Sequence, residues 1–346
     1  MNHISFYIGN KLIGSNNPPL IQTMSDIKTS LVKENIILTN DLSKRGLDMM
    51  RFSVLDEEDA RALAIIKKSV SIPIIADIHF SSVLAHLSLD ANVDKIRINP
   101  GNFPSLSSLR DLINEAKDKD IAIRIGVNSG SLNKFKGKTS STEDDILLSL
   151  DETLQVFKDE GFEKLVLSLK TSDPQILENL YRKAYEKYPY PLHIGLTESG
   201  LPILGAMRST YALANLLSDN IGDTIRISLA GDRKDELRAC KEILKLTGRK
   251  KDIPTMIVCP GCGRTLIDLK ECANLVQERL DFINKNITVA VMGCPVNGIG
   301  EAKDADLGIA GSGKENIYLL FEKGKELGLY QKQEAIAKLF ELIEKY

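Results

Sequence analysis

Eight short apolar runs alternate with segments of helical periodicity through the first two-thirds of this chain. Runs of this length, separated by helical patterns of roughly 12–20 residues, predict parallel strands joined by crossover helices. Eight such units over about 250 residues match the size of a closed (β/α)8 TIM barrel. A doubly wound open sheet usually has fewer strands and begins with a glycine-rich turn, which is absent here. The runs span residues 19–24, 47–52, 72–77, 93–98, 121–126, 164–169, 192–196 and 224–228.

The remainder of the chain predicts a separate, smaller α/β domain. Asp232 is a candidate N-cap for the last barrel helix, and Gly248–Pro254 has the composition of a linker. Beyond the linker we expect strands over 255–258, 287–292, 307–310 and 317–321, and helices over 266–283 and 332–346. The sequence therefore predicts two domains, a barrel over residues 1–250 and an α/β domain over residues 251–346.

The composition is that of an ordinary globular protein, with 43% apolar and 27% charged residues. The net charge of -2 provides no broad basic field for nucleic acid. No apolar run is long enough to span a bilayer, and the N-terminus lacks the pattern of a signal peptide. We expect a cytoplasmic protein with no nucleic-acid or membrane partner.

Polar and basic side chains occur where each predicted barrel strand ends. In a (β/α)8 barrel the C-terminal ends of the strands build the reaction site. Guanidinium groups match phosphate oxygens with paired hydrogen bonds, so several of them at one mouth indicate an anion of diphosphate size. Each residue alone has a simpler explanation, such as an ion pair for Arg51 or a helix cap for Asp77. The strand ends and following turns carry Gln22, Arg51, Asp77, His79, Arg97, Asn99, Arg124, Asn128, Lys170, Thr197, Glu198, Arg226 and Ser228.

Three of the five cysteines lie in turns rich in glycine and proline. Cys259 and Cys262 share a Cys-Pro-Gly-Cys turn, and Cys294 follows the predicted strand at 287–292. Clustered cysteines in a reducing compartment more often bind metal or carry out redox chemistry than form disulfides. Cys240 and Cys272 fall in helical patterns and are expected to be small buried side chains.

The cysteine turns favour an iron–sulfur cluster over zinc. A structural zinc site needs four tight ligands, and here a second pair is missing because all four histidines lie in the barrel part. A [4Fe–4S] cluster accepts three cysteines, since one iron can take another ligand and serve as a substrate site. Glu301, seven residues after Cys294, is a candidate for that ligand, and Cys272, ten residues after Cys262, competes with it.

These residues belong to long motifs that resemble the 4-hydroxy-3-methylbut-2-enyl diphosphate synthase family in its short bacterial form. The two longest motifs are Cys259–Thr265 (CPGCGRT) and Val291–Gly311 (VMGCPVNGIGEAKDADLGIAG). The barrel segments Ile96–Asn102, Arg124–Leu132 and Leu196–Gly200 match as well. The resemblance runs through nearly the whole chain and is weaker only at the N-terminus and beyond Ser312.

The resemblance implies an iron–sulfur oxidoreductase of the methylerythritol phosphate route to isoprenoids. Its substrate would be 2-C-methyl-D-erythritol 2,4-cyclodiphosphate, whose ring is opened and dehydroxylated reductively to 4-hydroxy-3-methylbut-2-enyl diphosphate. A flavodoxin or ferredoxin would supply the two electrons. Members of the family work as homodimers in which the cluster domain of one chain closes over the barrel mouth of the other.

Carried over by position, the resemblance also implies roles for individual residues. Cys259, Cys262, Cys294 and Glu301 would hold a [4Fe–4S] cluster. Glu198 and Glu301 would be the catalytic carboxylates, with Glu198 as an acid/base whose pKa is set by burial against cationic neighbours. The phosphate ligands would be Arg51, Arg97, Arg124, Lys170, Arg226 and Ser228, and the other substrate contacts would be Asp77, Asn128, Thr197 and Asn297.

Two alternative interpretations explain part of the sequence. A barrel whose cysteines hold a structural zinc would be a pterin-related transferase or lyase, since pteroate synthases use a similar barrel. A non-enzymatic electron carrier would explain the cysteine turns, but it would not explain the basic residues at the strand ends.

Overall fold

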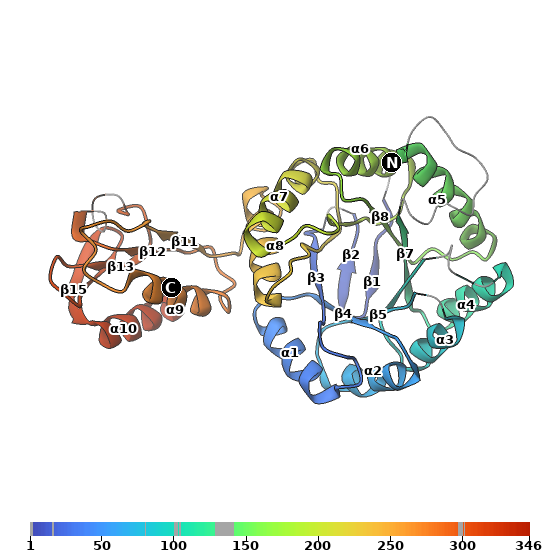
Figure 1. Ribbon diagram of the computed structural model, residues 1–346, viewed down its shortest axis with the longest axis horizontal. Helices are drawn as coiled ribbons and strands as arrows, with labels where there is room; N and C mark the ends of the chain where they lie inside the picture. The colour runs from blue at the N-terminus through green and yellow to red at the C-terminus, as the bar shows by residue number, and fades with distance from the viewer. Residues whose placement is uncertain are drawn as a thin grey trace. The chain divides into compact units, whose positions relative to one another are not determined.

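The computed structural model describes residues 3–15, 17–79, 81–99, 103, 105–128, 142–296, 300 and 302–346, and the side chains of residues 128, 142 and 170 lie outside this description. The chain divides into two compact units, Met1–Lys250 and Lys251–Tyr346. The first unit is a ring of helices around parallel strands, and the second is a sheet with helices packed on it (Figure 1).

The first unit is the predicted (β/α)8 barrel. Its described residues form eight parallel strands in the order β8-β7-β6-β5-β4-β3-β10-β9. A parallel bridge between Leu167 of β8 and Leu192, just before β9, brings the two ends of this sheet together. Each predicted apolar run overlaps one strand. The strands are β3 (Leu20–Met24), β4 (Met49–Ser53), β5 (Ile74–Asp77), β6 (Lys95–Ile98), β7 (Ala122–Asn128), β8 (Leu165–Lys170), β9 (His193–Ile194) and β10 (Thr224–Ile225).

A helix follows each barrel strand, as right-handed crossovers require. Asp56, Ser81 and Asp173 each accept a backbone N–H from the helix that they precede, and Asp232 caps the last barrel helix as predicted. No helix among the described residues combines the length and the apolar character needed to cross a lipid bilayer. The ring consists of α1 (Val32–Lys44), α2 (Glu57–Ser69), α3 (Ser82–Asp90), α4 (Leu106–Asp118), α5 (Thr142–Asp159), α6 (Pro174–Lys187), α7 (Pro202–Ser218) and α8 (Arg233–Leu246).

An antiparallel hairpin that the apolar pattern does not predict precedes the barrel. It consists of β1 (Phe6–Ile8) and β2 (Lys11–Ile13). Its inward side chains are buried against residues at the N-terminal ends of four barrel strands, namely Met49, Ile75, Ala122 and Val166. The hairpin therefore covers the N-terminal end of the barrel with apolar side chains, opposite the end where the predicted site residues lie.

The second unit is a five-stranded sheet in its described residues, in the order β11-β12-β13-β14-β15. The first three strands are parallel, and β14 and β15 add antiparallel. Val276 of α9 and Leu339 of α10 belong to one core with Val289 and Ile309 of the sheet, so both helices cover the same face (Figure 1). The edge strand β15 is not predicted. The elements are β11 (Thr255–Val258), α9 (Leu269–Leu280), β12 (Thr288–Met292), β13 (Leu307–Gly311), β14 (Ile317–Glu322), β15 (Lys325–Gln331) and α10 (Lys332–Lys345).

The hairpin is expected to contribute to the stability of the barrel. Ile13 is fully buried in the cluster that includes Met49 and Ile75. Ile13→Ala should lower the free energy of unfolding by about 3 kcal/mol, because it leaves a cavity in a packed core. Tyr7→Ala on the exposed face of the same hairpin should change it by less than about 0.5 kcal/mol. Chemical denaturation of the full chain measures both, and equal midpoints for the two variants would show that the hairpin does not belong to the cooperative core.

Candidate active site

Charged side chains from four neighbouring strands meet inside the C-terminal end of the barrel. We call this region, the C-terminal ends of β3 to β10 with the turns that follow them, the barrel mouth. The strand register places Asp77 beside Arg97 and Arg97 beside Arg124. Paired residues of neighbouring strands point to the same face of a sheet, so these three lie at one level. All three are buried, as is Arg51 on β4.

Asp77 is the carboxylate around which this group is arranged. Its oxygens lie 3.6 Å from Nε of Arg51, 3.3 Å from Nη1 of Arg97 and 3.5 Å from Nε2 of His79. Burial alone would raise the pKa of Asp77, but the charge of Arg51, a hydrogen bond from His79 and the charges of Arg97 and Arg124 outweigh it and hold this pKa well below its usual range. Burial lowers the pKa of Arg51 to about 10, which leaves its side chain cationic at neutral pH. Asp77 is thus an internal counter-ion, and the cap of the following helix is Ser81 instead.

Several buried polar atoms inside the barrel have no hydrogen-bond partner among the described residues. All three guanidinium nitrogens of the fully buried Arg124 lack one, as do Nε of Arg97 and both amide atoms of Gln22. Lys95, also fully buried, lies at the start of β6, level with Ile75 and Ala122, and its Nζ is 3.8 Å from the sulfur of Met49. Burial and the nearby charges of Arg124 and Arg51 lower the pKa of Lys95 well below its usual value. Unpaired buried polar groups are costly, so they indicate a place for an anion or ordered water.

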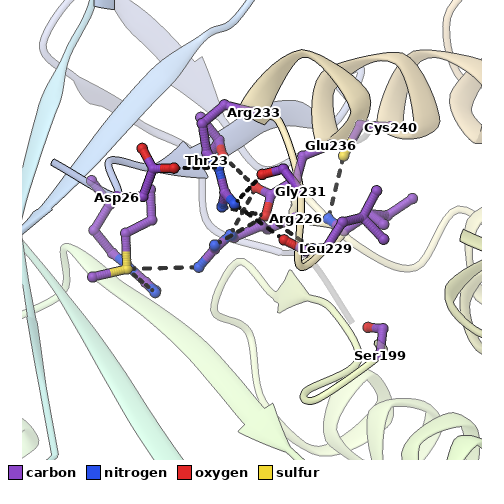
Figure 2. Close-up of polar contacts among 12 residues, drawn as sticks. Thr23, Asp26, Ser199, Arg226, Leu229, Gly231, Arg233, Glu236 and Cys240 are labelled. Carbon is purple, nitrogen blue, oxygen red and sulfur yellow. Dashed lines mark hydrogen bonds and ion pairs between the residues drawn. The ribbon is translucent and has the colours of Figure 1, made fainter. Parts of the chain in front are cut away.

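Next to this group, just after β10, Arg226 is held by a carboxylate that the sequence motifs do not reveal. Its Nε and Nη2 each donate to Glu236 of α8 at 3.3 Å (Figure 2). Its Nη1 lies 3.7 Å from the sulfur of Met24, which also accepts from Nη2 of Arg51 at 2.8 Å. Met24 therefore links the two arginines. A signal for Glu236 does exist in the sequence, since it lies on the buried stripe of α8 with Cys240 and Leu244.

The remaining predicted residues of the mouth lie on its rim. Thr197 and Ser228 are partly buried in the turns after β9 and β10. Glu198 is exposed, with a left-handed backbone φ of 57°. Within the barrel unit Glu198 is therefore not buried against cationic side chains, and its acid/base role stays a prediction. The backbones of Asn128 and Lys170 complete β7 and β8, but their side chains lie outside the described part of the chain, as do Asn297 and Glu301 entirely.

The cysteine turns leave adjacent strands of the second unit. β11 and β12 are parallel neighbours, with Val258 opposite Val291, so the turns that follow them lie side by side. The backbone N–H of Cys259 donates to the carbonyl of Val291 at 3.2 Å, and the N–H of Gly293 donates to the sulfur of Cys259 at 3.1 Å. A side chain at Gly293 would place its Cβ 2.6 Å from Oγ1 of Thr265, so only glycine fits there.

The neighbouring turn is fixed by Thr265. Its hydroxyl accepts from the N–H of Cys262 at 3.1 Å, and its own N–H donates to the carbonyl of Cys262 at 2.9 Å. A hydrogen bond with Cys294 and the negative charges of the Cys262 and Cys294 thiolates raise the pKa of Arg264. A cavity of about 470 Å³ opens beside Cys259 and Cys262.

The donor set suits an iron–sulfur cluster. Soft thiolates are the ligands that such clusters prefer, and N–H groups directed at the sulfurs tune them. Within the described residues, no three His, Cys, Asp or Glu side chains converge closely enough to hold a single ion. A cluster requires a different arrangement, because each thiolate binds its own iron. Cys272, the competing fourth ligand, is fully buried in the core of the unit, and burial raises its pKa to about 11.

The counter-ion role of Asp77 predicts a pH-dependent contribution to stability. Because its pKa in the folded chain is lowered, its ionised form stabilises the fold at neutral pH, and this contribution is lost as the pH falls below about 4. Asp77→Asn should lower the free energy of unfolding at pH 7 by about 3 kcal/mol, since it leaves two buried guanidinium groups without a partner. The variant should also decline less than the native chain in acid. Denaturation at several pH values, with the exposed Asp111→Asn as control, would contradict this if the three proteins behave alike.

Comparison with known families covers both units. The first matches the GcpE TIM-barrel domain over residues 4–241, and the second matches the GcpE protein C-terminal domain over residues 255–345. A relative from Caldanaerobacter subterraneus is 41% identical over 98% of this chain and 95% of its own. Another, from Bacillus subtilis, is 42% identical over 92% of this chain and 84% of its own. Both are named 4-hydroxy-3-methylbut-2-en-1-yl diphosphate synthase (flavodoxin).

Among solved structures, a dihydropteroate synthetase aligns with a TM-score of 0.54 and 12% identity over 71% of this chain and all of its own. At that identity the likeness shows a shared barrel fold alone, and it gives no support to the pterin-related alternative. The sequence relatives instead confirm the resemblance that the cysteine and barrel motifs indicate. Matched by both domain models and by relatives along nearly its whole length, the chain belongs to the GcpE family of 4-hydroxy-3-methylbut-2-en-1-yl diphosphate synthases.

Proposed function

We propose that this enzyme opens and dehydroxylates the ring of 2-C-methyl-D-erythritol 2,4-cyclodiphosphate, giving 4-hydroxy-3-methylbut-2-enyl diphosphate in the methylerythritol phosphate pathway. The observation that carries the proposal is the set of buried, partly unpaired guanidinium groups in the barrel mouth of a chain that belongs to this family. A cyclic diphosphate brings about two negative charges, which these cations would offset. The relatives' name supports flavodoxin as the electron donor, and a ferredoxin is the alternative carrier.

The basic side chains would orient the substrate by its phosphates. Arg124 and Arg97 have buried nitrogens without a partner among the described residues, and Arg51 is held beside them by Asp77. Fixing the guanidinium groups before substrate binds lowers the entropic cost of binding, because fewer side chains must be ordered. In this proposal the phosphate ligands are Arg51, Arg97, Arg124, Lys170, Arg226 and Ser228, and Asp77, Asn128, Thr197 and Asn297 make further substrate contacts.

Glu198 would deliver the proton that the departing hydroxyl requires to leave as water. It stands on the rim in an exposed turn with a left-handed backbone, and strained conformations of this kind are concentrated at functional sites. Its exposure on the rim leaves the carboxyl group accessible to bound substrate.

A [4Fe–4S] cluster held by Cys259, Cys262, Cys294 and Glu301 would supply the two electrons and a Lewis-acidic iron. The N–H of Gly293 and the guanidinium group of Arg264 would stabilise the negative charge of the thiolates. The second unit would thus be the cluster domain and the first the substrate domain. We further propose a homodimer in which the cluster domain of one chain serves the barrel mouth of the other, working in the cytoplasm.

Anaerobic purification followed by assay tests the function directly. The protein should be brown, contain about four irons per chain, and convert the cyclodiphosphate with reduced flavodoxin or ferredoxin as donor. A colourless protein that binds one zinc and leaves the cyclodiphosphate unchanged would favour the zinc-stabilised alternative.

Glu198→Gln separates proton delivery from substrate binding. The change keeps the size of the side chain but removes its acid, so turnover should fall by at least about 100-fold. The iron content, the visible spectrum and the KM for the cyclodiphosphate should stay close to those of the native enzyme. The matched control is Glu186→Gln, an exposed residue on the outer helix α6. Turnover near the native rate in Glu198→Gln would remove this residue from the acid/base role.

A further inference from the structure

Glu236 is a buried carboxylate that collects donors from several separate segments at the barrel mouth. It extends from the first turns of α8 and is 1% exposed (Figure 2). Its Oε1 accepts from the backbone N–H of Leu229 at 3.0 Å and from Nη1 of Arg233 at 2.7 Å. Its Oε2 accepts a short hydrogen bond from the hydroxyl of Thr23 on β3. Arg226, the residue after β10, donates to both oxygens.

This arrangement engages only one edge of the Arg226 guanidinium group. Glu236 takes the edge formed by Nε and Nη2, each at 3.3 Å. The remaining nitrogen, Nη1, lies 3.7 Å from the sulfur of Met24, a weak acceptor that an anion would readily replace. A guanidinium group offers five donors in a fixed fork, so holding one edge determines where the other points. Figure 2 shows Glu236 between Arg226 and Arg233, with Thr23 beside it.

We propose that Glu236 is a positioning residue, which fixes Arg226 so that its free Nη1 edge faces the phosphates of the substrate. The inference rests on the proposed function, because it assumes that Arg226 binds a phosphate. Glu236 has no place among the predicted ligands, and it acts only through Arg226. Thr23 and the N–H of Leu229 in turn fix Glu236, so the orientation of Arg226 is tied to the first barrel strand, β3, and to the turn after the last one, β10.

A simple electrostatic role for Glu236 makes the opposite prediction. The charged groups in direct contact with its carboxylate are Arg226 and Arg233, and Arg233 also lies 3.7 Å from Asp26. If Glu236 only reduced the positive charge of the mouth, its neutralisation would strengthen the binding of an anion. If it positions Arg226, the same change weakens binding, because the fork loses its fixed direction. The sign of the change therefore separates the two roles.

Glu236→Gln is the decisive variant. The amide can keep its oxygen at the Oε1 position for Leu229 and Arg233, with its NH2 group toward Thr23, whose hydroxyl can turn to accept. Only the bond from Nε of Arg226 is then lost, together with the charge. Pyrophosphate binding to the full chain, measured by calorimetry, should weaken about tenfold, and KM for the cyclodiphosphate should rise about tenfold with kcat nearly unchanged. Unchanged or tighter pyrophosphate binding would overturn the proposal.

Asp48→Asn is the matched control. Asp48 is also a buried carboxylate that accepts from a backbone N–H, that of Ile21 at 2.9 Å, and from a cation, Lys11 at 2.8 Å, but it lies at the start of β4. Its amide variant should lose stability and leave pyrophosphate affinity and KM unchanged. If a loss of folding stability is enough to weaken pyrophosphate binding, Asp48→Asn will also bind pyrophosphate more weakly. The role of Glu236 is then structural only.

Thr23→Val provides a second variant that keeps the charge of Glu236. It removes one donor to the carboxylate, so pyrophosphate binding should weaken about threefold, whereas a purely electrostatic role predicts no change. This variant decides the question if Glu236→Gln does not fold. Pyrophosphate binding can be measured without turnover. A native enzyme that binds pyrophosphate but leaves the cyclodiphosphate unchanged would therefore contradict the proposed function. It would not contradict the role of Glu236.

Discussion

Cationic side chains crowd the interior of the barrel mouth, and burying like charges together is unfavourable unless opposite charge compensates them. Two buried carboxylates provide that compensation. Asp77 pairs with Arg51 and Arg97 on one side, and Glu236 pairs with Arg226 and Arg233 on the other. Arg124 remains without a carboxylate partner among the described contacts. The mouth therefore keeps an excess of positive charge, and this excess is the physical reason to expect an anionic substrate.

The two ends of the barrel have different roles: one contributes to folding stability and the other to ligand binding. At the N-terminal end, the hairpin of β1 and β2 packs apolar side chains against the strand starts. At the other end, the same strands carry polar side chains that are buried but only partly paired. Apolar burial at one end can offset the cost of buried charge at the other, since folding stability is a small difference between large terms. The hairpin thus belongs to the explanation of the site even though it lies at the opposite end of the barrel.

Much of the fold can be predicted from periodicity, because each barrel strand is an apolar run between helices. The hairpin escapes prediction because β1 and β2 are short and stand outside the alternation of strands and helices that reveals the equally short β9 and β10. The edge strand β15 escapes because most of its residues are exposed and its sequence is largely polar. Strand ends reveal Arg51, Asp77, Arg97 and Arg124, since topology alone brings those positions together. Glu236 lies on a helix, and its contact with Arg226 depends on how α8 packs on the barrel. The exposure and left-handed backbone of Glu198 belong to the loop after β9, which the apolar pattern does not describe.

Backbone pairing rather than side-chain packing organises the functional residues of both units. In the barrel, the register of β5, β6 and β7 sets Asp77, Arg97 and Arg124 at one level. In the second unit, the register of β11 with β12 brings the N–H of Gly293 to the sulfur of Cys259. Strand register is a property of many cooperative hydrogen bonds, so it holds these groups in place whether or not a ligand is bound. Single side chains such as Glu236 then adjust the orientation of groups whose positions the strands have already determined.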